Sequence, residues 1–188
     1  MVKSTNTRHL LEFSMENQRV RLSKRLLKDA FIELLSHKPL SKVTIKEICE
    51  KAQVNRTTFY KHYTDEYSLL MEIEQEYLDV LVGNLCTEAN RLDKFLTSLF
   101  ENPILTRILV LGDTQTSFFG KMFKMPMMKE LLTKKSSINI DADNQEKAHL
   151  FIFSGVVSLV IDWVGNDFYA SPIELAKTIR HIVAPMVR

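Results

Sequence analysis

Apolar residues in the first third of the chain recur at three- and four-residue steps, which is the spacing of one face of a helix. From Arg19 onward this stripe is formed by Leu22, Leu26, Ala30, Phe31, Leu34 and Leu35. Because Pro39 disfavours helical backbone at the residue before it, we expect the helix to end near Ser36. Residues 1–16 lack a clean period, and we expect them to form a mobile arm.

Two short helices and a turn follow this first helix. Thr44 and Glu47 have the spacing of a capping box, in which each side chain satisfies a backbone N–H at a helix start. We expect that helix to last about nine residues and to end at a turn over Gln53-Val54. Asn55 is a favourable cap for a third helix of about eight residues at most, and Thr64 or Asp65 caps a fourth. A helix followed by two short helices around a tight turn is the helix-turn-helix arrangement.

The third helix divides into two faces. At about 100° per residue, four side chains fall within one arc of about 140°: Arg56, Thr57, Tyr60 and Lys61. Phe59 lies on the opposite side, and with Val54 it is the expected anchor into the core. The arc therefore presents a cation, a hydroxyl, a phenol and a second cation.

The remaining chain also has helical patterns, and the fold class we expect is all-α. The predicted helices cover 92–100, 104–111, 117–124, 145–164 and a last helix opened by Ser171-Pro172. The helix over 145–164 is apolar around most of its circumference, which is typical of a helix buried on more than one side. We divide the chain into an arm (1–16), a helix-turn-helix domain (17–78) and a helical effector-binding and dimerisation domain (79–188).

Charge is distributed unevenly along the chain. Residues 1–64 carry thirteen Lys and Arg against six Asp and Glu, a net charge of +7, while the whole chain carries +2. A basic first third suggests an anionic partner for that part alone. The alternative is a tolerated imbalance with no partner.

Sequence motifs argue against an enzyme, a metal site and a cofactor. There is no Gly-rich phosphate loop and no H-E-x-x-H, and the five histidines show no metal-ligand spacing. A catalytic site assembled from distant residues stays open. The longest stretch without formal charge is fourteen residues, 148–161, and the N-terminus has no signal-peptide pattern, so we expect no membrane span and a cytoplasmic protein.

The segment from about Arg19 to Tyr77 resembles the DNA-binding domain of the TetR/AcrR bacterial transcriptional regulators. The likeness rests on Thr44-Ile45-x-x-Ile48, Ala52-x-Val54-Asn55, Phe59-Tyr60-x-His62-Tyr63 and Leu69-Leu70. The Tyr-x-His-Tyr motif is also similar to that of the branch containing activators of dihydroxyacetone kinase operons. The resemblance implies a homodimer on a pseudo-palindromic operator, joined through the last two helices at about 145–164 and 172–187, with an effector cavity in the second domain. Two positions depart from the pattern: Gln53 replaces a glycine in the turn, and Glu66 replaces a lysine near the phosphates.

The proposed partner is double-stranded DNA, and the residues have separate expected roles. Arg56 is the expected base reader, Thr57 is suited to a thymine methyl, and Lys61 is suited to a base or a phosphate. Thr44 and Lys46 are expected near phosphate. Asn55 caps the reading helix, and the resemblance implies backbone contacts for Tyr60 and His62.

A cluster of aromatic residues and methionine in the second domain is a candidate ligand site. Its members are Phe118, Phe119, Met122, Phe123 and Met125. Such residues line adaptable apolar pockets, but they also fill ordinary cores. We therefore weigh three hypotheses: a ligand-responsive DNA-binding regulator, a DNA-binding regulator controlled by a partner protein without a small-molecule effector, and a helical interaction module without DNA binding.

Overall fold

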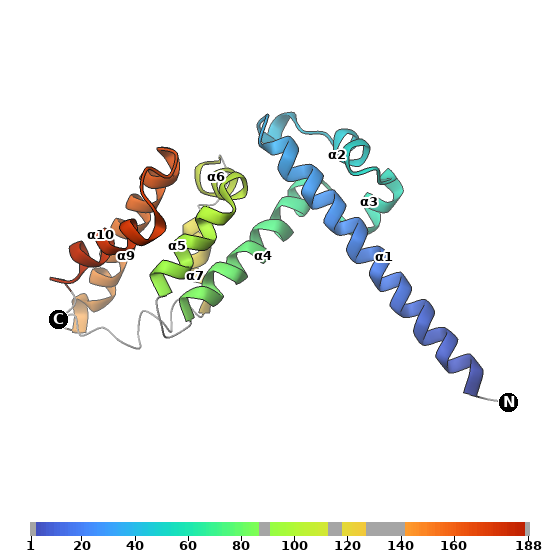
Figure 1. The fold of residues 1–188 in the computed structure, drawn as a ribbon, viewed down its shortest axis with the longest axis horizontal. Helices are drawn as coiled ribbons and strands as arrows, with labels where there is room; N and C mark the ends of the chain where they lie inside the picture. The colour runs from blue at the N-terminus through green and yellow to red at the C-terminus, as the bar shows by residue number, and fades with distance from the viewer. Residues whose placement is uncertain (1–2, 87–90, 113–117, 127–141, 187–188) are drawn as a thin grey trace. The chain divides into compact units, whose positions relative to one another are not determined.

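The computed structural model describes the backbone of residues 3–86, 91–112, 118–126 and 142–186, and the side chains of 18–85, 91–112, 118–126 and 144–186. Every regular element in these ranges is a helix, which confirms the predicted all-α fold (Figure 1). The chain divides into two compact units, Met1–Ile73 and Glu74–Arg188. The division falls inside one helix, α4 (Glu66–Cys86), which contributes to both units.

The N-terminal unit contains three further α-helices around a small core. They are α1 (Lys3–Leu35), α2 (Ile45–Ala52) and α3 (Arg56–His62), with a 3-10 turn over Leu40–Lys42. α1 packs against both α2 and α3. The core is built from side chains with no exposed surface in each element: Leu27, Phe31, Ile48, Phe59 and Leu69.

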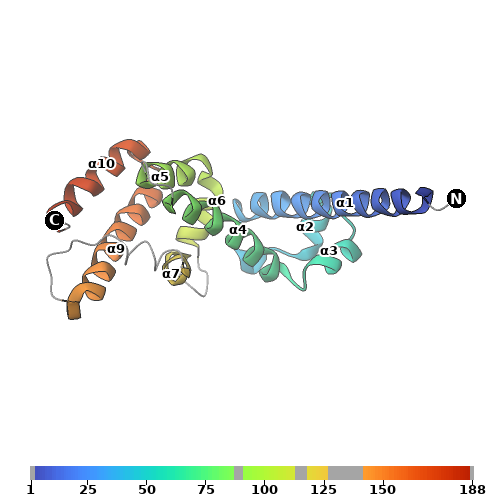
Figure 2. The same cartoon turned by 90° about the horizontal axis from the view of Figure 1, so that it is seen from below.

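The first helix differs from its prediction at its start and in its buried face. It begins at Lys3 rather than at Arg19, because no Gly or Pro interrupts the chain before Pro39. Leu22 and Leu26 are 58% and 40% exposed, whereas Leu27 is fully buried. Leu26 directly precedes Leu27 and is turned about 100° away from it around the helix, so it does not share the buried face. The short α2 and α3 lie beside only the C-terminal part of α1 (Figure 2), so these two helices do not cover the earlier part of the predicted stripe.

The C-terminal unit contains the rest of α4 and five further described helices. These are α5 (Arg91–Glu101), α6 (Pro103–Leu111), α7 (Phe118–Lys124), α9 (Ala142–Gly165) and α10 (Pro172–Val183). α5 packs against α10, and α6 packs against α9. Inside the unit, the hydroxyls of Tyr77 and Thr106 lie 2.6 Å apart, and Thr106 donates to the carbonyl of Leu99 at 2.8 Å. Burial raises the pKa of Tyr77 to about 12.

The loop after α9 has a strained backbone that aromatic contacts support. Asp167 and Phe168 both have positive φ, 59° and 54°, which L-residues rarely adopt. The Phe168 ring packs edge-on against Trp163 with centroids 4.8 Å apart, and the Phe168 N–H donates to the Trp163 carbonyl at 2.8 Å. The Trp163 indole N–H donates in turn to Ala170 at 2.8 Å. These contacts fix the turn from which α10 begins.

The long helix α9 is less covered than its sequence predicts. Only 17% of its most apolar 18-residue window is buried, and Leu150, Phe151 and Ile161 are 50%, 70% and 39% exposed. By length and composition alone, Asn144–Gly165 could cross a membrane. The sequence estimate missed this because it counted only residues between formal charges, and a span can contain one or two charges. The exposed face of α9 therefore lacks a partner among the described residues.

Candidate nucleic-acid interface

The start of α2 is fixed by the predicted capping box. The Thr44 hydroxyl accepts the Glu47 N–H at 3.3 Å, and the Glu47 carboxylate accepts both the Thr44 N–H at 3.0 Å and the Thr44 hydroxyl at 2.8 Å. Lys38 also donates to Glu47 at 2.6 Å. The hydrogen bonds from Lys38 and then from Thr44 lower the pKa of Glu47 to about 2. Glu47 is therefore a carboxylate held charged at the N-terminus of α2.

The turn between α2 and α3 places Gln53 in the left-handed region. Its φ and ψ are 54° and 38°, and its side chain is exposed. Glycine is the residue that adopts this conformation at little cost. The turn therefore does require positive φ at the position where this sequence departs from the family pattern.

α3 is capped at its start and anchored by one aromatic side chain. The Asn55 side-chain oxygen accepts the Thr57 N–H at 2.8 Å, which confirms Asn55 as the cap. Phe59 is fully buried, and its ring lies 5.6 Å from those of Tyr60 and Tyr63. Val54, the second predicted anchor, is half-buried. Both ends of α3 and its inner face are thus held by specific contacts.

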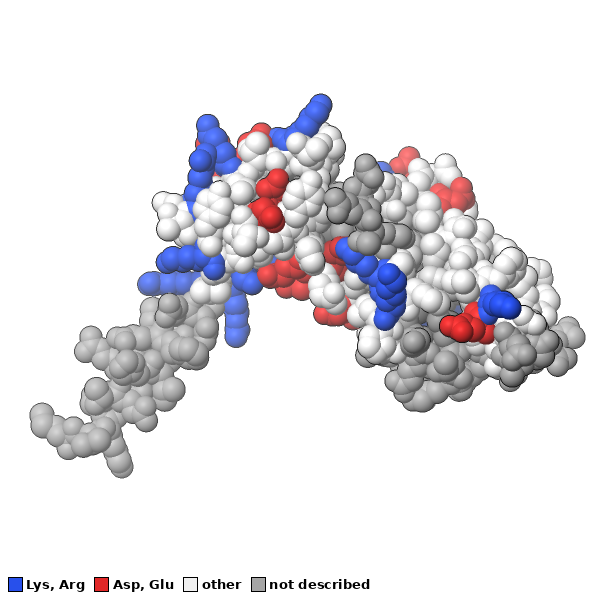
Figure 3. Space-filling model, turned by 180° about the vertical axis from the view of Figure 1, so that it is seen from behind, with Lys and Arg blue, Asp and Glu red and all other residues white. Residues whose placement is uncertain are grey.

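The outer face of α3 presents the four side chains that share the predicted arc. Arg56, Thr57, Tyr60 and Lys61 are all exposed. Neither Arg56 nor Lys61 forms an ion pair with another residue in the ranges where side chains are described. Lys and Arg side chains gather on the surface of the N-terminal unit (Figure 3). Two unpaired cations beside a hydroxyl and a phenol form a surface suited to phosphates and base edges.

The other predicted DNA contacts are less available in this structure. The Thr44 hydroxyl donates to Glu47, so a bond to phosphate has to compete with the capping box. Lys46 is exposed and lies 3.8 Å from Glu50. His62 is half-buried, and its pKa is lowered by loss of solvent and by the nearby positive charge of Lys24. Four of the predicted residues therefore share the exposed face of α3. Thr44, Lys46 and His62 are not part of that face.

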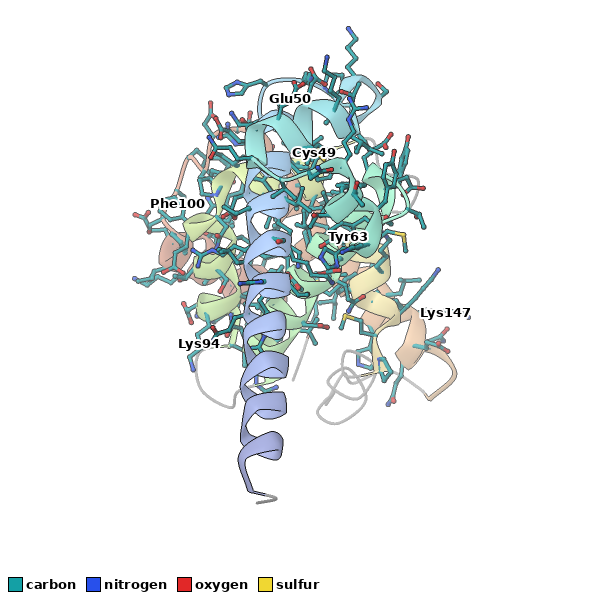
Figure 4. All side chains as sticks on the ribbon, turned by 90° about the vertical axis from the view of Figure 1, so that its right-hand side faces the viewer. Cys49, Glu50, Tyr63, Lys94, Phe100 and Lys147 are labelled. Atoms are coloured by element: carbon teal, nitrogen blue, oxygen red, sulfur yellow. The ribbon has the colours of Figure 1, made fainter. Side chains whose placement is uncertain are left out.

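A bracing cluster behind α3 was missed by the sequence analysis. Lys24 and Lys28 of α1 donate to the two oxygens of Glu72 in α4, at 2.8 Å and 2.6 Å. Lys24 also lies 5.4 Å from the ring centroid of the buried Tyr63, which sits beside α1 (Figure 4). These contacts join residues more than thirty positions apart, so no local spacing could have indicated them. They fix the segment that follows α3.

The predicted ligand residues lie mainly in the interior of the C-terminal unit. Phe118, Phe119 and Met122 of α7 are at most 3% exposed, and the Phe123 ring lies 4.9 Å from that of Phe153 in α9. Met125 is half-buried. A separate open groove of about 460 Å³ lies among α5, α9 and α10, lined by Leu92, Val156, Ile179, Arg180, Val183 and Ala184. None of the predicted ligand residues lines that groove.

The helices that build the α3 surface coincide with a known domain. Residues 27–73 match the family model for bacterial regulatory proteins of the tetR family, from the buried part of α1 to the first part of α4. The N-terminal domain is therefore similar to that of the tetR family. The family consists of regulators rather than enzymes, as the sequence motifs predict.

A curated relative extends the likeness beyond this domain. Over 166 residues the chain is 19% identical to YxbF of Bacillus subtilis (strain 168), described as an uncharacterised HTH-type transcriptional regulator. That alignment covers 84% of this chain but only 44% of the relative, so the chain spans less than half of its length.

Two solved structures share the fold over most of the chain. A TetR transcriptional regulator from Streptococcus agalactiae 2603V has a TM-score of 0.70 and 22% identity, covering 90% of this chain and 98% of that one. The dihydroxyacetone kinase operon activator DhaS has a TM-score of 0.65 and 18% identity, covering 88% and 96%. A protein of the branch that the sequence resembles is therefore among the structural neighbours.

Proposed function

We propose that this protein is a sequence-specific, DNA-binding transcriptional regulator that places α3 in the major groove. The observation that carries the proposal is the exposed face of α3. There Arg56 and Lys61 have no ionic partner among the described side chains, while Phe59 and Asn55 hold the helix. The +7 charge of residues 1–64 supplies attraction to phosphate through counterion release. A DNA partner is consistent with a cytoplasmic location.

Each residue on this face has a distinct proposed contact. The Arg56 guanidinium fits the O6 and N7 atoms of guanine, and the Thr57 methyl fits a thymine methyl. Lys61 binds a base or a phosphate, while Tyr60 and His62 contact the backbone. Thr44 and Lys46 meet phosphate at the start of α2, with Thr44 exchanging its bond to Glu47 for one to DNA.

We propose a homodimer joined through α9 and α10. Exposed residues run along α9 at three- and four-residue steps. They are large at the ends and small in the middle: Leu150, Phe151, Ser154, Gly155, Ser158 and Ile161. α10 adds the exposed side chains of Ile173 and Ile182. A second copy would cover these apolar residues, and the small central residues allow two helices to approach closely. This accounts for the low burial of α9 without a membrane.

Control of DNA binding is proposed to act through the C-terminal unit. Two α3 helices in successive major grooves need a separation of about 34–36 Å. An effector or a partner protein that prefers one separation would change DNA affinity by its differential affinity for the two states. The buried aromatic and methionine residues of α7 support a small-molecule effector, and the alternative is a partner protein acting on the same unit.

The proposal is tested by selecting bound sequences from random DNA and measuring affinity against salt. We expect a palindrome and a log–log salt slope that reflects several phosphate contacts. Arg56→Ala should weaken binding by about 1–3 kcal/mol and relax preference at one position of each half-site. Lys94→Ala, an exposed cation on α5 and outside the proposed dimer interface, is the charge-matched control and should leave affinity unchanged. Binding that ignores sequence, or unchanged preference in Arg56→Ala, would contradict this assignment.

A further inference from the structure

Glu74 of α4 is a buried carboxylate with one unsatisfied oxygen. The residue is 3% exposed, and its Oε2 atom forms an ion pair with Lys121 of α7. Its Oε1 atom is buried and has no hydrogen-bond partner among the residues that the structure describes. Buried polar atoms in native proteins almost always have a partner, so the position indicates that a donor group is missing.

The surroundings of this oxygen are apolar and aromatic. Tyr77, one helical turn along α4, faces Phe118 of α7 with ring centroids 6.1 Å apart, just as Glu74 faces Lys121. Phe119 and Met122 of α7 are also buried. The Tyr77 hydroxyl is already bonded to Thr106, so it is not the group that Glu74 lacks. A donor reaching Glu74 therefore has to belong to a molecule that tolerates an apolar setting.

Charge balance restricts the chemistry of that donor. The Lys121 ammonium already neutralises the Glu74 carboxylate. A second cation beside the pair would leave an excess positive charge in the interior, which costs far more than burying a neutral group. A neutral hydroxyl supplies the missing hydrogen bond without that cost.

We propose that Glu74 Oε1 accepts a hydrogen bond from the hydroxyl of a neutral, largely apolar small molecule bound between α4 and α7. The inference rests on the proposed control through the C-terminal unit and names the chemical class of the effector. Lys121 holds the carboxylate in place and neutralises it, while the aromatic and methionine side chains contact the apolar body of the molecule.

The test compares three molecules of similar shape on the full chain: benzyl alcohol, benzylamine and toluene. Binding is followed by titration calorimetry and by the NMR signal of the Met122 methyl group. Wild-type protein should bind benzyl alcohol about tenfold more tightly than either toluene or benzylamine, because only the alcohol is both neutral and a donor.

Two variants separate a binding role for Glu74 from a structural one. In Glu74→Leu the advantage of benzyl alcohol over toluene should disappear, because the acceptor is gone. In Lys121→Met the carboxylate loses its counter-charge. The preference for benzyl alcohol over benzylamine should therefore reverse and favour benzylamine. Lys121 is one-third exposed, so its substitution leaves less of a core defect. Glu101→Gln, an exposed acid on α5, should behave as wild type.

Several outcomes would overturn the inference. Absence of benzyl alcohol binding to wild type would show that a neutral hydroxyl compound does not reach the Glu74 oxygen. An alcohol preference that persists in Glu74→Leu, or that fails to reverse in Lys121→Met, would place the binding elsewhere. If wild type binds its selected DNA but shows any of these results, the regulator proposal stands and only the effector class fails. If wild type binds benzyl alcohol as expected but no DNA, the regulator proposal fails on its own.

Discussion

Gln53 is held in a left-handed conformation by the geometry of the turn between α2 and α3. An L-residue with a Cβ loses roughly 1–2 kcal/mol there, and glycine does not. Gln53→Gly should therefore raise the free energy of unfolding of the N-terminal unit by about 1 kcal/mol or less, since glycine also gains freedom in the unfolded chain. Urea denaturation followed by circular dichroism measures this change.

The same substitution in a helix provides the control. Gln75 is an exposed residue within α4, where glycine is unfavourable by about 1 kcal/mol. Gln75→Gly should therefore destabilise the protein while Gln53→Gly stabilises it. Equal effects of the two substitutions would show that the backbone of Gln53 carries no strain.

Residue roles could be predicted from sequence where the cause is local. Thr44 and Asn55 were predicted as caps because capping depends on residues two or three positions apart, and both bonds are present. The pairing of Lys24 and Lys28 with Glu72 joins α1 to α4, and no local pattern carries that information. The orphaned oxygen of Glu74 also depends on α7, which lies more than forty residues away in sequence.

At the scale of the element, α2 depends on one carboxylate whose charge is maintained far into acid. The pKa of Glu47 is lowered from 4.5 to about 2 by hydrogen bonds from Lys38 and Thr44. A lowered pKa in the folded state means that the charged form stabilises the fold above pH 4.5, and that this contribution is lost as the pH falls from 4.5 to 2. The stability of wild type should therefore fall over that window.

A neutral isostere should remove that part of the pH dependence. Glu47→Gln retains hydrogen-bonding atoms but cannot titrate, so its urea midpoint should change less than that of wild type between pH 4.5 and 2. Glu101→Gln, whose side chain is exposed at the end of α5, should keep the wild-type slope. Parallel pH profiles for wild type and Glu47→Gln would contradict this account.

The ends of the helices were predicted better than which face of each helix is buried. Pro39 set the end of α1, and Ser171-Pro172 set the start of α10, because these residues restrict their own backbone. The buried face of α1 and the coverage of α9 depend on which neighbours reach them. Leu22, for example, is as apolar as Leu27 but lies where no short helix covers it.

At the scale of the whole molecule, the uncovered face of α9 makes the oligomeric state the strongest test of the architecture. An apolar helix whose main window is only 17% buried would be poorly soluble alone, and pairing with a second copy removes that surface from water. Phe151 is 70% exposed, so Phe151→Glu should shift a dimer to monomer while leaving the folded chain intact. Met71→Glu, which alters a similarly exposed residue of the N-terminal unit, should remain dimeric.

Gly155 allows a sharper form of this prediction. A Cβ added at Gly155 would meet no atom within 4 Å beyond its chain neighbours and the adjacent backbone of its own helix. Glycine within a helix is also unfavourable by about 1 kcal/mol relative to alanine. Gly155→Leu should therefore preserve or raise the stability of the monomer. In a dimer whose α9 helices cross near Gly155, the added side chain should separate them and weaken association about tenfold or more. Sedimentation velocity at micromolar concentration measures the shift, and affinity for a two-half-site operator should fall with it while affinity for a single half-site does not. A Gly155→Leu protein that dimerises as tightly as wild type would place the interface on another surface. A wild-type protein that is monomeric would contradict the proposed dimer.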